Sequence, residues 1–143
     1  MSNKLIKPQT NEIIVDDGSK VFPIKNKHGK LLGRFEFTPS DTNISRRYDE
    51  VVDYLNNLTV PENTEEAGKK IEDAVVEKIS YLIGGNAEEA FFSVLGAFTP
   101  LASGELFFEN VLKAVSAVIE RELSVRTKKV QRRMNKYVAK YHK

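Results

Sequence analysis

The chain has 143 residues, of which 41% are hydrophobic, and a formal net charge of +2. This is the length of one ordinary domain, and the absence of cysteine excludes disulfides, thiol catalysis and cysteine-based metal sites. No apolar run approaches the roughly 20 residues of a membrane span, and the polar start resembles neither a signal peptide nor a transit peptide. We therefore expect a cytoplasmic protein with no membrane partner.

The small net charge conceals an uneven distribution. The last twenty residues, 124–143, hold eight Lys or Arg and no acidic residue, whereas the other 123 hold fourteen basic and twenty acidic residues. The C-terminal end is therefore about +8 and the rest about −6. Asymmetry of this kind bears on binding partners more than on fold.

The N-terminal third predicts a flexible arm followed by a small sheet. Residues 1–12 are mostly polar and predict the arm. Residues 13–37 predict a β-hairpin region, in which Gly29 takes a positive φ in the turn and Ile13–Val15 adds a short third strand. In the second hairpin strand Phe35 and Phe37 share one face, which suits a sheet that is covered on one side only.

The rest of the chain predicts four helices. Asp41 or Asn43 caps the first, Gly84-Gly85 ends the second, and Asn86 with Glu89 forms a capping box before the third. The apolar spacing then sets the helical ranges. These are residues 42–58, 64–83, 86–97 and 104–141.

The last predicted helix is the longest, and its apolar stripe runs on into the basic end. The stripe advances in steps of four, three and four residues, and only Arg126 interrupts its apolar character. Such a period stays close to one side of an α-helix. The stripe consists of Phe108, Leu112, Val115, Ile119, Leu123, Arg126, Val130, Met134, Tyr137 and Tyr141.

Together these elements predict a single domain over residues 13–143. The fold class is α+β and mostly α, with an N-terminal β-hairpin followed by about four helices, of which the C-terminal one is longest.

The sequence offers little for catalysis. His28 lies in the predicted hairpin turn and His142 next to the C-terminus, and neither has a partner at metal-ligand spacing. Acidic pairs such as Glu65-Glu66 and Glu88-Glu89 fall in first helical turns, where negative charge complements the helix dipole. We expect no enzyme activity, no metal and no cofactor.

Five phenylalanines fall within eighteen residues. Their helical spacing is more typical of a core than of a ligand pocket, but adjacent pairs point in different directions, so some are candidates for a self-association surface. The five are Phe91, Phe92, Phe98, Phe107 and Phe108.

The basic end allows several interpretations. It is either a solvated terminus, a nucleic-acid contact through its cationic side chains, or a helix that packs on a sister subunit or partner chain. A membrane-surface helix would need a larger apolar face, which often includes Trp, and this chain contains no Trp. We favour helix packing, with a seam formed by Val130, Met134, Tyr137 and Tyr141. The cations that flank this seam are Lys129, Arg132, Arg133, Lys136 and Lys140.

Two segments resemble a known family. Residues 33–48, GRFEFTPSDTNISRRY, are similar to the strand-to-helix junction of small tail proteins in phages and prophages of Gram-positive bacteria. Residues 98–105, FTPLASGE, and the long helix ending in KYVAKYHK resemble their C-terminal half. The resemblance covers most of residues 33–143 and points to the tail assembly chaperones of siphophages.

The resemblance implies a non-enzymatic role. Such chaperones coat the long helical tape measure protein and recruit tail tube subunits around it, so the implied partners are the tape measure protein, the tail tube protein and further copies of the chain. The implied location is the host cytoplasm and not the mature virion. The alternative is a phage accessory protein that binds nucleic acid through the basic C-terminal helix.

Overall fold

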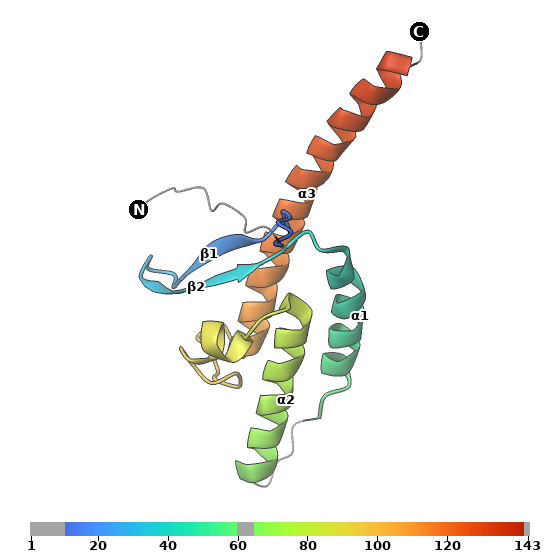
Figure 1. Cartoon of the computed structure of the whole chain (residues 1–143). Helices are drawn as coiled ribbons and strands as arrows, with labels where there is room; N and C mark the ends of the chain where they lie inside the picture. Colours follow the sequence, from blue (N-terminus) through green and yellow to red (C-terminus); the bar gives the residue numbers. More distant parts are fainter. Residues whose placement is uncertain (1–10, 60–64, 142–143) are drawn as a thin grey trace.

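The computed structural model describes residues 11–59 and 65–141, with side chains as far as residue 135 in the last helix. Its elements follow one another as strand β1 (Lys20–Lys25), strand β2 (Leu31–Phe37), helix α1 (Thr42–Asn56), helix α2 (Glu65–Ile83), a short π-helical turn η1 (Glu88–Phe92) and helix α3 (Phe107–Tyr141). The predicted α+β fold is confirmed: a hairpin precedes four helical segments, and the last is the longest (Figure 1). The predicted arm lies almost entirely outside the described residues.

The hairpin is antiparallel and forms a two-stranded sheet, in which Phe22 pairs with Phe35. Its turn is built as predicted. The Asn26 side chain accepts hydrogen bonds from the backbone N–H groups of His28 and Lys30, at 2.9 and 3.0 Å, and Gly29 has a φ of 87°. The expected third strand is wrong: Ile13–Val15 form no strand and are exposed. Asp16 and Asp17 instead bend the chain by accepting from the N–H groups of Gly18 and Ser19.

The ends of α1 and α2 follow the predicted capping chemistry. Asp41 is the N-cap of α1, and its carboxylate accepts from the N–H of Asn43 at 2.9 Å. Gly84 ends α2 with a φ of 68°, and its N–H donates to the carbonyl of Ser80. Gly85 has a packing role, because a Cβ there would lie 2.8 Å from the Phe35 ring.

The chain between α2 and α3 differs most from the prediction. The expected helix over residues 86–97 is reduced to η1, although Asn86 does accept from the Glu89 N–H as the predicted cap. Helix α3 begins at Phe107 and not at residue 104. The reason is a tight turn joined by a bridge between Pro100 and Leu106, with the first N–H groups of α3 donating to carbonyls of the preceding loop.

One apolar cluster lies where the hairpin, α1, α2 and the beginning of α3 meet. Phe35 and Phe37 face it, which confirms the one-sided strand pattern of β2. Helix α1 packs mainly on α2, while the second part of α3 extends away from the rest of the molecule (Figure 1). The buried hydrophobic residues are Phe35, Phe37, Ile44, Val51, Val75, Ile79, Leu82, Ile83, Ala87, Ala97, Phe108, Val111 and Val115.

Candidate functional site

The candidate site is the second part of α3, residues 124–141, which we call the basic half. From Thr127 to Asn135 every side chain is exposed. Val130 is 52% exposed and Met134 is 47% exposed, although both are apolar. An apolar pair one helical turn apart, exposed between cations, is typical of a helix that packs on another surface.

The structure brings part of the predicted seam and its flanking cations together on this segment. Val130 and Met134 share one face, and Lys129, Arg132 and Arg133 are exposed beside them. The Arg133 guanidinium lies 3.7 Å from the sulfur of Met134. The remaining predicted residues continue the sequence pattern, but their side chains lie outside the described part of the chain. They are Lys136, Tyr137, Lys140 and Tyr141.

The five phenylalanines proposed for self-association pack within the chain. Phe108 is buried, and the other four pack partly buried against the core cluster. Their rings connect the hairpin to α3: Phe35 lies 5.7 Å from Phe91, and Phe92 lies 5.7 Å from Phe107. Phe98 and Phe108 form a further edge-on pair at 5.8 Å. These contacts account for the aromatic excess without a second copy, and self-association through these residues stays a prediction.

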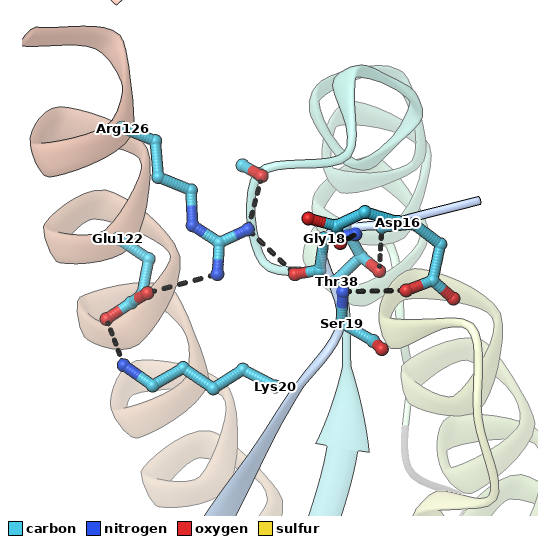
Figure 2. A network of polar contacts seen from close by, with 9 residues as sticks. Asp16, Gly18, Ser19, Lys20, Thr38, Glu122 and Arg126 are labelled. Atoms are coloured by element: carbon cyan, nitrogen blue, oxygen red, sulfur yellow. Dashed lines mark hydrogen bonds and ion pairs between the residues drawn. The ribbon is translucent and has the colours of Figure 1, made fainter. Parts of the chain in front are cut away.

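Arg126 marks the boundary between the buried and exposed parts of α3, and Figure 2 shows its contacts. One guanidinium nitrogen donates to the carbonyl of Gly18 at 2.8 Å and to the hydroxyl of Ser40 at 2.9 Å. The other donates to Glu122 at 3.3 Å. Arg126 therefore fastens the loop before β1 and the turn after β2 to the same helix, which explains a cation within an apolar stripe.

Glu122 completes this network from one turn earlier in α3. Its side chain is only 14% exposed and accepts from the Lys20 ammonium at 3.3 Å. Burial alone would raise the pKa of Glu122, but the hydrogen bond and charge of Lys20, together with Arg126, hold it below its ordinary value. The folded protein therefore favours the ionised carboxylate.

A groove between α1 and α3 is a feature that the sequence did not predict. One section, of about 410 Å³, runs beside Ile44, Ile119 and Leu123. A second section, of about 630 Å³, continues past Val52 and Leu112. The two sections share Tyr48, Ser116 and Glu120, so they form one continuous groove.

The apolar wall of this groove is partly exposed, and Leu123 is 45% exposed. Among the residues that line the groove, acidic side chains outnumber basic ones. The lining residues hold Asp41, Asp49, Glu105, Glu109 and Glu120, against the single cation Lys113.

The described residues offer no metal site. No group of three or more His, Asp or Glu side chains among them is arranged so that it could hold a metal ion. His28 is exposed in the hairpin turn, and His142 lies outside the described part of the chain. None of the described helices is long and apolar enough to cross a membrane.

Comparison with known proteins adds no assignment. The chain matches none of the family models, characterised proteins or solved structures with which it was compared.

Proposed function

We propose that this protein is a phage or prophage tail assembly chaperone. In this role it binds the helical tape measure protein, helps recruit tail tube subunits, self-associates and catalyses no reaction. The resemblance of residues 33–48 and 98–105 supplies the family, and the structure supports a binding role.

The observation that carries the proposal is the exposed seam on the basic half of α3. Val130 and Met134 remain about half exposed on a helix that extends beyond the body. A helix in water gains most of its stability from packing its apolar face. A long helical partner offers the apolar stripe that such a seam needs, and the flanking cations suit acidic residues beside that stripe.

Co-expression tests this role. The chain should co-purify with the tape measure protein of the same phage or prophage, the long coiled-coil partner proposed here, as one complex on a sizing column. Replacing Val130 and Met134 by Ser should remove the complex. The matched control is the pair Gln131→Ser and Asn135→Ser, which has the same spacing but lies about 100° round the helix. Loss of the complex in both pairs, or its persistence in both, would contradict a seam at Val130 and Met134.

Salt separates this role from nucleic-acid binding through the same segment. Six to ten phosphate contacts would weaken binding by roughly 10³–10⁵ between about 50 and 200 mM salt. A mainly apolar helix interface should lose little over the same range. Strong binding to DNA or RNA with that steep salt dependence, and none to the coiled-coil protein, would favour the alternative.

A further inference from the structure

The groove between α1 and α3 is long enough to hold about four turns of a helix. Along α3 it extends from Phe108 to Leu123, and Glu105 lines it just before the helix begins. The 16 residues of 108–123 span about 22 Å at roughly 1.5 Å per residue. The 16 residues of 126–141, within the basic half, have the same length.

The charge of the groove selects a cationic occupant. Asp41 pairs with Arg47 and Glu105 pairs with Lys113, at 3.8 and 2.9 Å. Among the described residues, Asp49, Glu109 and Glu120 make no ion pair. These three carboxylates line a partly apolar groove on a body that carries about −6, whereas the basic end of the same chain carries about +8. The chain is therefore complementary to itself in charge.

The spacing of the α3 stripe also allows two antiparallel copies to align. Its steps from Phe108 to Tyr141 are 4, 3, 4, 4, 3, 4, 4, 3 and 4 residues, which read the same in both directions. Two antiparallel copies of this helix, centred between Leu123 and Arg126, therefore align stripe position with stripe position. Phe108 and Val115 are buried in the chain's own core, so the stripe positions of the first half that are open to a second copy are Leu112, Ile119 and Leu123.

In this register Ile119 of one copy lies opposite Val130 of the other, and Leu112 lies opposite Tyr137. The same register places Glu120 opposite Lys129. Two groove-lining apolar residues thus meet apolar positions and Glu120 meets a base, while Leu123 lies opposite Arg126 and Lys113 lies opposite Lys136. The matched pairs are those expected of a two-fold, self-complementary interface.

We propose that the groove between α1 and α3 binds the basic half of α3 from a second copy, and that the two copies exchange these segments in an antiparallel pair. The rest of the chain packs beside only the first half of α3, and the second half projects away from it (Figure 1). Two bodies therefore sit at opposite ends of the paired helices and do not overlap.

The pair rests on the self-association included in the proposed function, and it adds a regulatory consequence. The basic half binds either a second copy or the coiled-coil partner, since both use Val130 and Met134. Binding of the coiled-coil partner should therefore separate the dimer, so that single copies of the chain bind to the partner.

Disulfide cross-linking tests the geometry directly, because the natural chain has no cysteine. Full-length protein with both Ile119→Cys and Val130→Cys should form a covalent dimer on mild oxidation. Each single variant should remain monomeric on a non-reducing gel, because position 119 faces position 130 and not itself. Within one chain these positions are eleven residues apart, roughly 16 Å along the helix, which is too far for a disulfide. Cross-linking of the single variants, as in a parallel pair, would overturn the proposal.

A charge exchange at exposed positions provides a second measurement. Glu120→Lys alone and Lys129→Glu alone should each weaken dimerisation about threefold to tenfold, because each reversal acts twice in a two-fold pair. The double variant should recover the natural association constant in sedimentation equilibrium. Additive weakening in the double variant would exclude this register.

The outcomes also separate this proposal from the function proposed above. If the protein forms oligomers but the double-cysteine variant forms no cross-link, this arrangement is wrong while self-association remains supported. A monomer at all concentrations would overturn both the arrangement and self-association, while co-purification with the coiled-coil protein is measured independently. A monomer whose groove binds that protein or nucleic acid would assign the groove to that partner.

Discussion

The two halves of α3 are one uninterrupted helix with one apolar stripe, yet the body covers only the first half. Phe108 and Val115 are 7% and 6% exposed, whereas Val130 and Met134 on the same stripe are about half exposed. Periodicity alone does not distinguish these halves, because it records which side of a helix is apolar and not whether anything lies against it. The difference shows that one apolar stripe has a buried part and an exposed part, and that the boundary lies where the packed body ends.

The largest expected loss of stability comes from a substitution in the buried half of α3. Phe108→Ala should lower the free energy of unfolding by about 3–5 kcal/mol, because it removes a large side chain from the core and leaves a cavity. Met134→Ala, in the exposed half, should stay within about 0.5 kcal/mol at concentrations where the protein is monomeric. Urea unfolding followed by circular dichroism measures both. Similar losses would mean that the two halves do not differ as described.

A smaller effect is expected at the boundary itself. Arg126→Ala should cost about 1–3 kcal/mol in the same assay, because the carbonyl of Gly18 and the hydroxyl of Ser40 lose a charged donor. Arg126→Lys should recover only part of this, since an ammonium lacks the planar fork of the guanidinium. Arg132→Ala, six residues further into the exposed segment, is the control and should be neutral. A neutral Arg126→Ala would show that the network does not fasten the loops to α3.

The pH dependence of stability tests the contribution of Glu122 to the same boundary. The folded pKa of Glu122 lies below its ordinary value of 4.5, so its stabilising contribution is present above that value and is lost as the pH falls through the folded pKa. The natural protein should therefore exceed Glu122→Gln in thermal midpoint at about pH 6, and the difference should shrink towards about pH 3. Glu77→Gln, at an exposed position on α2, is the control for loss of a carboxylate elsewhere. A constant difference for Glu122→Gln would mean that its charge is not involved.

The smallest effect on folding is expected at the exposed end. Truncation after Thr127 removes only exposed side chains among the described residues, so the unfolding midpoint of the monomer should change little. The same truncation should abolish both dimerisation and co-purification with the coiled-coil partner. Unfolding of the truncated protein would place the seam in the protein's own core, and the binding surface would then be sought near Phe91–Phe108.

The sequence by itself determined the features that depend on neighbouring residues. The Asn26–Gly29 turn, the Asp41 cap and the Gly84 stop each rest on backbone chemistry within a few residues. The inward face of β2 and the continuity of α3 follow from periodicities of two and of about 3.6 residues. Such local signals were sufficient to predict an α+β fold with a long last helix.

Only the tertiary structure decided which surfaces meet. Contacts with distant residues pack Phe91 and Phe92 into the chain's own core, and the bridge at Pro100 delays the start of α3. Arg126 appeared in the sequence as an interruption, and its partners Gly18 and Ser40 lie 108 and 86 residues away. The acidic groove likewise needs α1 and α3 placed side by side. Local periodicity does not encode such pairings, because each depends on where chain segments far apart in sequence come to lie.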